Sequence, residues 1–336
     1  MTFVGGEFDL RWTFARPFKV KYRHGNGSEH FAAAGEIMLG RTAMTKFSRT
    51  PMPGDRSVTA ESMPRISIIV ASLDAGPMIG RCLNSIAECG YPAVEVIVAD
   101  GGSKDGTLES LEASRRHMGG MLTWISEPDG GIADAWNKAV SMATGDWLLF
   151  LGADDTIASP TVLARMALHL ETAFPAHRVV YGQVAFVDHE GHVLRLMDRP
   201  WAPVEFRSCR YNLPHQAVFH HRSLFAEYGR FDASLRIVAD FDFLLRHLMT
   251  AEPLHVPRLV VAKMRVGGAS TATLLAPVGV KEQIRLHQRH VGGISAVLTG
   301  ALFKAWIKIA LYHIGGDGLV FQVGRAYRSM TLRGQA

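Results

Sequence analysis

Apolar runs alternate with amphipathic stretches between residues 65 and 155 of this 336-residue chain. The runs read RISIIVAS, VEVIVAD, LTWIS and DWLLFLGADD. The stretches between them repeat apolar residues at helical spacing, as at Ile79, Cys82, Leu83 and Ile86. Runs that are apolar almost throughout are typical of strands buried on both faces. The pattern therefore predicts an α/β fold with a doubly wound, mostly parallel sheet.

A carboxylate follows each of the four runs. The residues concerned are Asp74, Asp100, Glu127, Asp129, Asp154 and Asp155. Ligands of open α/β sheets bind at the edge where the carboxyl ends of parallel strands meet, so we predict one acidic rim. A helix-capping role for Asp154 or Asp155 accounts for one acid but not for the set. Gathering so much negative charge calls for a cation, and Mg²⁺ or Mn²⁺ suits carboxylates shared with substrate phosphates.

Glycines crowd the loops GGSKDGT and PDGG, which follow the second and third runs. Glycine permits tight turns and lets a ligand approach the backbone, so Gly130 joins the candidate binding residues. The dinucleotide pattern G-x-G-x-x-G is absent, which argues against a dehydrogenase. The lack of a basic, glycine-rich triphosphate loop weakens the case for a nucleotidyltransferase.

Composition narrows the class of protein only slightly. The chain is 48% hydrophobic and 20% charged, as expected for a globular protein with a large core. Its three cysteines lack metal-type spacing, which favours a reducing compartment, and we expect a cytoplasmic protein. A formal net charge of +5 suits nucleic acid, an anionic membrane or a phosphorylated ligand without choosing among them. The motifs point to no nucleic acid partner.

Four blocks together carry a family resemblance. ISIIVASLDA, VIVADGGSKDGT, ISEPDGGIADAWNKA and GDWLLFLGADD agree in order, spacing and identity with a family 2 glycosyltransferase over residues 64–160. The resemblance implies the nucleotide-diphospho-sugar transferase fold of the GT-A type. It also implies an inverting, metal-assisted transfer from a nucleoside diphosphate sugar, most often a UDP-sugar.

The resemblance also assigns roles to single residues. It places Asp74 and Asp100 against the base and ribose of the nucleotide and Asp129 near the nucleotide. Asp154 and Asp155 fall on the acidic motif that binds the metal, and either of them is a candidate ligand. The position where that motif often begins with Asp is Gly152 in this chain.

The second half of the chain is expected to bind the acceptor. Alternating apolar residues before and after the turn HEGH predict a β-hairpin near 179–197. Further on, His215 and Gln216 match the His-Gln pair of the resembling family, and Asp240 matches the position of its catalytic base. A carboxylate there can accept the proton of an attacking hydroxyl.

Asp242 competes with Asp240 for this role. Two helix positions separated by two residues diverge by about 200°, so only one of these side chains faces the site. We favour Asp240 as the base and keep Asp242 with His215 and Gln216 as acceptor-site candidates. Capping of the following helix by Asp240 and an ordinary structural role for His215 are the other interpretations.

The chain divides into three predicted parts. Residues 1–63 form a weakly ordered extension, or alternatively a small accessory element. Residues 64–270 form the catalytic domain, and residues 271–336 an amphipathic helical C-terminal segment. The catalytic domain splits into a nucleotide half, 64–160, and an acceptor half, 161–270. KEQIRLHQRH, in the last segment, is a charged helical face, and its basic residues are interpreted as solvated surface rather than a phosphate clamp.

The apolar stretch ISAVLTGALFKAWIKIALYHIGG near the C-terminus is long enough for a contact with a membrane to be considered. Lys304 and Lys308 interrupt it one helical turn apart, which disfavours a membrane-spanning helix. Two interpretations stay open for residues 294–333: peripheral contact with the inner face of the cytoplasmic membrane, or packing on the domain. Arg325, Arg328 and Arg333 add basic charge that an anionic leaflet attracts.

The leading hypothesis is therefore a metal-dependent inverting glycosyltransferase. Its expected partners are a nucleoside diphosphate sugar donor, a glycan or lipid-linked saccharide acceptor, and Mg²⁺ or Mn²⁺. Surface polysaccharide synthesis is the pathway that such family members commonly serve. The alternatives are a non-catalytic protein on the same fold that binds sugar nucleotides or glycans, and a nucleotidyltransferase.

Overall fold

The fold is taken from a computed structural model that describes residues 22–23, 29–30, 63–266, 275–293 and 295–333. The chain divides into two compact units, Met1–Ser57 and Val58–Ala336. In the first unit, strands β1 (Tyr22–Arg23) and β2 (Glu29–His30) pair in antiparallel fashion. The rest of the predicted extension over residues 1–63 lies almost entirely outside the described residues.

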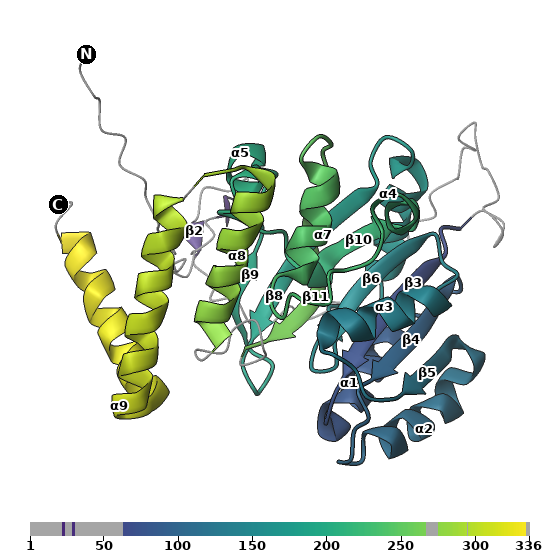
Figure 1. Ribbon diagram of the computed structural model, residues 1–336. Helices are drawn as coiled ribbons and strands as arrows, with labels where there is room; N and C mark the ends of the chain where they lie inside the picture. Colours follow the sequence, from purple (N-terminus) through teal and green to yellow (C-terminus); the bar gives the residue numbers. More distant parts are fainter. Residues whose placement is uncertain (1–21, 24–28, 31–62, 267–274, 294, 334–336) are drawn as a thin grey trace. The chain divides into compact units, whose positions relative to one another are not determined.

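A nine-stranded mixed sheet forms the centre of the second unit, in the order β5-β4-β3-β6-β10-β8-β11-β7 with β9 paired to β8 (Figure 1). The first four predicted strands are confirmed, and they run parallel to one another. The strands are β3 (Ile66–Ser72), β4 (Val94–Asp100), β5 (Leu122–Ser126), β6 (Trp147–Gly152), β7 (Thr156–Ile157), β8 (Val179–Val187), β9 (Val193–Met197), β10 (Val218–His221) and β11 (Leu254–Arg265).

Helices cover both faces of this sheet, as the apolar pattern predicts. The helices are α1 (Gly76–Ala87), α2 (Thr107–Met118), α3 (Ile132–Met142), α4 (Val162–Ala173), α5 (Pro203–Arg207), α6 (Ser223–Tyr228), α7 (Ala239–Leu248), α8 (Ala276–His290) and α9 (Ala296–Arg333). One core cluster joins α1, α2 and α4 to the sheet, and the other joins α3, α6 and α7. Figure 1 shows α3 and α7 lying over one face.

The register of the parallel strands brings their carboxyl ends to one edge. Ser72 pairs with Asp100, Asp100 pairs with Ser126, and Ala71 pairs with Gly152. The loops that carry the predicted acids therefore begin side by side. The predicted single rim is confirmed as a feature of the backbone.

The acceptor half completes the sheet on the other side of β6. Strand β10 runs antiparallel between β6 and β8, and the predicted hairpin is confirmed as β8 and β9. Strand β11 returns parallel to β8. A short 3₁₀ helix, η3 (His215–Ala217), leads into β10 and brings the His-Gln pair next to β6.

The first part of α9 is apolar and largely exposed. Residues Ala296–Ile314 span 19 residues with a mean hydropathy of 1.3, so this helix is long and apolar enough to cross a membrane. Only 11% of the stretch is buried in the protein. Leu298 and Ala305 are buried, whereas Phe303, Trp306 and Ile314 are exposed.

Candidate functional site

Asp100 organises the loop between β4 and α2. Its carboxylate accepts hydrogen bonds from the hydroxyls of Ser72, Ser103 and Ser126, and from the backbone N–H groups of Gly102 and Ser103. Burial raises the pKa of Asp100, but these hydrogen bonds outweigh it and hold the pKa below its ordinary value. The Asp100 side chain is buried, and both its oxygens accept hydrogen bonds, so it holds the loop after β4 against the ends of β3 and β5. Its contact with a nucleotide stays a prediction.

Asp74 joins the first two loops of the rim. Its backbone has a positive φ of 48°, and its exposed carboxylate accepts a hydrogen bond from Lys104 N–H at 3.1 Å. In the other direction, Asp74 N–H donates to Ser103 Oγ at 2.8 Å. This exchange holds an exposed carboxylate at the edge of the sheet, where a ligand can reach it.

The loop between β5 and α3 lies against the loop between β4 and α2. Asp129 accepts a hydrogen bond from Gly131 N–H at 2.8 Å, and its other oxygen would lie only 2.7 Å from a Cβ at Gly101. A side chain at Gly101 would therefore displace Asp129. Asp129 thus lies beside the Asp100 loop, and Gly130 follows it directly in the chain; the binding roles of both stay predictions.

Asp154 and Asp155 differ in environment, although they are adjacent. Asp155 is 2% exposed and accepts hydrogen bonds from Gly152 N–H at 2.9 Å, Arg265 N–H and the Gln216 amide. Burial, together with the charge of Asp154, raises the pKa of Asp155 to about 7. Asp154 is only half-buried. Of the two, Asp154 is the carboxylate that can present oxygens to a cation.

Gly152 explains why the acidic motif can lack its usual first Asp. A Cβ at this position would come within 2.8 Å of Asp154 Oδ1 and 3.0 Å of Asp155 Oδ2. The space of the missing side chain is thus taken by the carboxylates that follow. Mg²⁺ commonly uses one or two carboxylates plus substrate phosphates, so this donor set fits a divalent metal.

A cavity of about 190 Å³ opens beside Asp154. Three cationic side chains line it, Arg81 from α1 and Lys263 and Arg265 from β11. Arg265 also donates a hydrogen bond to His189 O at 2.8 Å in the β8–β9 turn. Asp188 and Glu190 line the same cavity, so the mouth of the sheet places these three cationic side chains among three carboxylates.

The His-Gln pair, His215 and Gln216, connects the acidic motif after β6 with Asp240 of α7. Gln216 contacts Asp155, as described above, and His215 lies near Asp240. His215 is buried and stacks on Phe150, with ring centroids 5.2 Å apart and an interplanar angle of 13°. Burial lowers the pKa of His215, and Asp240 acts in the opposite sense. Its Nε2 has no hydrogen-bond partner in the described protein.

Asp240 and Asp242 have opposite surroundings at the start of α7. Asp240 is half-buried and accepts a hydrogen bond from Asn212 Nδ2 at 3.1 Å. Asp242 is fully buried and forms an ion pair with Arg246. Only Asp240 keeps access to solvent, in line with the expectation that the two side chains diverge. The base and acceptor roles of these residues stay predictions.

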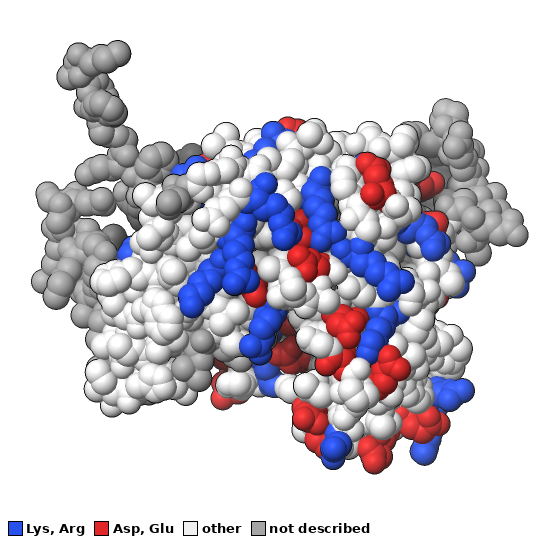
Figure 2. All heavy atoms as spheres, in the orientation of Figure 1, with Lys and Arg blue, Asp and Glu red and all other residues white. Residues whose placement is uncertain are grey.

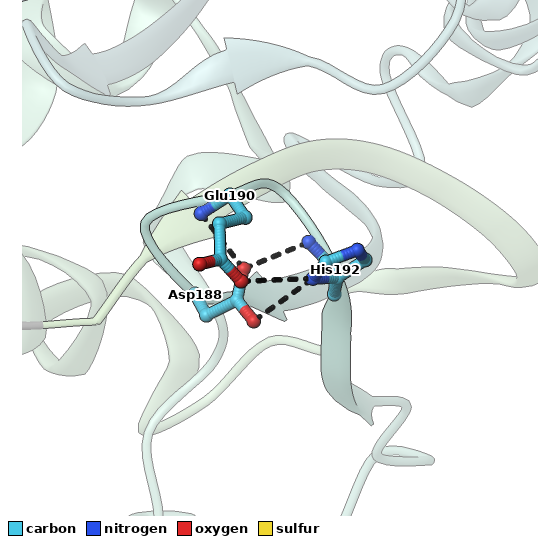
Figure 3. Close-up of side chains that lie close together, drawn as sticks. All are labelled: Asp188, Glu190 and His192. Atoms are coloured by element: carbon cyan, nitrogen blue, oxygen red, sulfur yellow. Dashed lines mark hydrogen bonds and ion pairs between the residues drawn. The ribbon is translucent and has the colours of Figure 1, made fainter.

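Sequence reasoning did not single out a cluster on the β8–β9 turn, shown in Figure 3. Asp188, Glu190 and His192 each offer one ligand atom within 4.8 Å of the others. His192 donates its backbone N–H to Asp188 at 2.9 Å, and its Nδ1 lies 3.2 Å from the same carboxylate. These contacts stabilise the exposed β8–β9 turn, so the cluster is explained without a bound metal.

Comparison with known families and proteins agrees with this geometry. The model of the family described as glycosyl transferase family 2 matches residues 67–227. The PGL/p-HBAD biosynthesis glycosyltransferase Rv2957 of Mycobacterium tuberculosis is 32% identical over 252 residues, covering 73% of this chain and 92% of that protein. An uncharacterized glycosyltransferase of the same organism, Rv1514c, is 31% identical over 260 residues, covering 73% of this chain and 94% of the relative.

Solved structures share the fold at lower identity. TarS 1-349 of S. aureus in complex with UDP-GlcNAc has a TM-score of 0.54 at 18% identity, covering 72% of this chain and 71% of that one. The mannosyltransferase PcManGT of Pyrobaculum calidifontis, in complex with GDP-Man and Mn²⁺, has a TM-score of 0.54 at 19% identity. That match covers 80% of this chain and 81% of the other.

Proposed function

Because this chain belongs to glycosyltransferase family 2, we propose that it transfers a sugar with inversion from a nucleoside diphosphate sugar, preferably UDP-linked, to a glycan or lipid-linked saccharide. The observation that carries the proposal is the parallel register of β3 to β6, which gathers the acidic loops at one edge. The solved neighbours that hold UDP-GlcNAc, or GDP-Man with Mn²⁺, support a donor of this class.

In this proposal the donor lies across the rim. Asp74 and Asp129 contact the nucleoside, while Asp100 holds their loops in place through its hydrogen bonds. Asp154 would hold a divalent metal, and Asp155 fixes the loop that carries Asp154 through its buried hydrogen bonds. When bound, the metal stabilises the negative charge that grows on the departing diphosphate. Arg81 and Lys263 add positive charge on the same side.

Asp240 acts as the general base. As the acceptor hydroxyl attacks the anomeric carbon, the C–O bond to the nucleoside diphosphate breaks and the hydroxyl proton passes to the Asp240 carboxylate. Asn212 orients this carboxylate through its 3.1 Å hydrogen bond. In this proposal the acceptor contacts Gln216, which bonds to Asp155, and the buried His215 supports this side of the site next to Asp240.

Donor turnover tests the proposal. Incubation with UDP-glucose, UDP-GlcNAc and GDP-mannose in the presence of Mn²⁺ is expected to release the nucleoside diphosphate slowly to water, and faster once an acceptor is found. EDTA is expected to abolish the release. If all these donors stay intact but still bind, the chain is a non-catalytic sugar-nucleotide binding protein instead.

We also propose that α9 docks on the inner face of a cytoplasmic membrane, in keeping with a lipid-linked acceptor in surface polysaccharide synthesis. Phe303, Trp306 and Ile314 form an exposed apolar surface, and Lys304 and Lys308 flank it. Figure 2 shows a largely uncharged area where Figure 1 places the first part of α9, next to a band of Lys and Arg side chains. An apolar stripe edged by lysines suits a membrane interface with anionic lipids. The name of the relative Rv2957, with its role in PGL/p-HBAD biosynthesis, does not conflict with this proposal.

Vesicle sedimentation tests the membrane contact. The full chain is expected to bind phosphatidylglycerol vesicles more tightly than phosphatidylcholine vesicles, and the double substitution Phe303→Gln plus Trp306→Gln is expected to weaken binding by about 10-fold or more. Leu168→Gln on α4 is the control, because Leu168 and Phe303 are both 69% exposed. Equal sedimentation of all three proteins would refute docking through α9.

A further inference from the structure

A carboxylate of α8 caps the segment that leads into α7. Glu282 accepts hydrogen bonds from the backbone N–H groups of Arg236, Ile237 and Val238, at 2.8, 2.9 and 3.2 Å. Glu282 is only 4% exposed, although a glutamate is seldom buried without a partner. The three donors immediately precede α7, where N–H groups have no partner within the helix. One side chain from a distant part of the chain therefore holds the backbone of the segment that enters α7, up to its N-cap Val238.

A second set of contacts joins the same two helices. Asp242, in the first turn of α7, is buried and pairs with Arg246 of its own helix. Its other oxygen lies 3.3 Å from Arg289 Nη1 and 3.4 Å from His290 Nε2, both at the end of α8. Thus a carboxylate of α8, Glu282, bonds to the backbone before α7, and a carboxylate of α7, Asp242, contacts basic side chains of α8. The interpretation of the basic residues of KEQIRLHQRH as solvated surface holds for the exposed Arg289, although it also pairs with Asp242, but not for His290, whose side chain is only 17% exposed.

These contacts bracket Asp240 on both sides along the chain. The N–H groups that Glu282 holds end two residues before Asp240, and Asp242 follows two residues after it. The side chain of Asp240 itself is held by one hydrogen bond, from Asn212. Two sets of polar contacts from α8 therefore hold the chain on either side of Asp240, and α8 lies outside the matched family region of residues 67–227.

We propose that Glu282 is a positioning residue for the glycosyl transfer step: it fixes the first turn of α7 so that the Asp240 carboxylate faces the acceptor hydroxyl. The proposal rests on the proposed function, in which Asp240 is the base. A displacement of about 1 Å at a reacting group can lower a rate by about 10²-fold. Loosening this cap therefore reduces turnover without touching the donor site.

Glu282→Gln tests the proposal in the full chain, with the donor that wild type turns over. The amide keeps the size of the side chain but turns one acceptor into a donor that faces backbone N–H groups. We expect kcat to fall by about 10- to 100-fold while KM for the donor stays within about 3-fold. Hydrogen exchange at residues 236–238 is expected to accelerate, and this readout needs no substrate.

Glu95→Gln is the matched control. Glu95 also accepts backbone hydrogen bonds, from Thr144 N–H at 2.7 Å and Gly145 N–H at 3.0 Å. It stands at the start of β4, the end of the strand opposite the rim. A structural effect alone would lower the thermal stability of both variants and leave kcat unchanged in both. Only Glu282→Gln is expected to lose kcat.

Gly279→Ala provides a second variant should Glu282→Gln fail to fold. A Cβ at Gly279 would meet Ile237 Cγ2 at 3.1 Å, so the alanine pushes the capped segment by a few tenths of an ångström. We expect a smaller loss of kcat with the fold intact. Unchanged kcat in Gly279→Ala and in any folded Glu282→Gln protein, measured against an active wild type, overturns the positioning role. An inactive wild type overturns the proposed function instead, whereas unchanged exchange at 236–238 in Glu282→Gln overturns the capping role by itself.

Discussion

Replacing Asp240 with asparagine is expected to lower the rate of sugar transfer by about 10²- to 10⁴-fold. The amide keeps the shape of the side chain and can still contact Asn212, but it cannot accept the proton of the attacking hydroxyl. Binding of UDP is expected to stay unchanged, because in the proposed mechanism Asp240 contacts the acceptor hydroxyl and not the nucleotide. Steady-state turnover and calorimetric UDP binding, measured on the same preparation, check both halves of this expectation.

Asp146→Asn is the control for that substitution. Asp146 precedes β6 at the edge of the sheet opposite the rim, where it accepts a hydrogen bond from Arg65 N–H at 3.3 Å. Its replacement is expected to leave turnover unchanged. Asp240→Asn turning over at the wild-type rate would exclude Asp240 as the base.

Asparagine substitutions of the two adjacent aspartates are expected to separate their roles. Asp154→Asn removes the accessible carboxylate, so metal-dependent donor turnover should fall by about 10²-fold or more at nearly unchanged stability. Asp155→Asn instead disturbs the buried contacts with Gly152, Arg265 and Gln216, and we expect it to lower the free energy of unfolding by about 1–3 kcal/mol. Chemical denaturation and a Mn²⁺ titration of turnover measure the two effects.

The opposite pattern would reverse this assignment. If Asp155→Asn raised the Mn²⁺ concentration needed for half-maximal turnover while Asp154→Asn did not, Asp155 would be the ligand. The unfolding measurement remains informative in that case, because it reports the loss of the three hydrogen bonds of Asp155 independently of metal binding.

The strand and rim predictions succeeded because their signals are local. Each of the first four strands is a short apolar run next to a polar loop, and buried parallel strands need such runs regardless of their neighbours. Once the strands are parallel, their carboxyl ends must meet, so the positions of Asp74 and Asp129 at one edge follow from chain order. The β8–β9 hairpin was predictable for the same reason, from an alternating pattern around a turn.

The state of each rim carboxylate was not predictable, because it depends on partners distant in the sequence. Asp100 receives hydrogen bonds from Ser72 and Ser126, which come from two other strands. Asp155 is buried by contacts with Gln216 and Arg265. A strand-end aspartate looks the same in the sequence whether it faces solvent or supports a loop.

Glu282 shows the same limit more sharply. It stands in a charged stretch whose composition is typical of a solvated helix, and its only sequence signal is its place among apolar neighbours such as Ile284 and Leu286. Its role arises from the docking of α8 on the start of α7, separated by more than 40 residues in the sequence. Long-range capping of this kind leaves no motif.

Calorimetric titration of UDP into the wild-type protein, with Mn²⁺ and again with EDTA, tests the central claim most directly. A nucleoside diphosphate site built on the acidic rim predicts saturable binding with Mn²⁺ and much weaker binding after chelation, because the carboxylates otherwise repel the diphosphate. GDP titrated in the same way distinguishes the base preference from the site itself. Absence of binding by both nucleotides, with and without Mn²⁺, would contradict a donor site at this edge of the sheet.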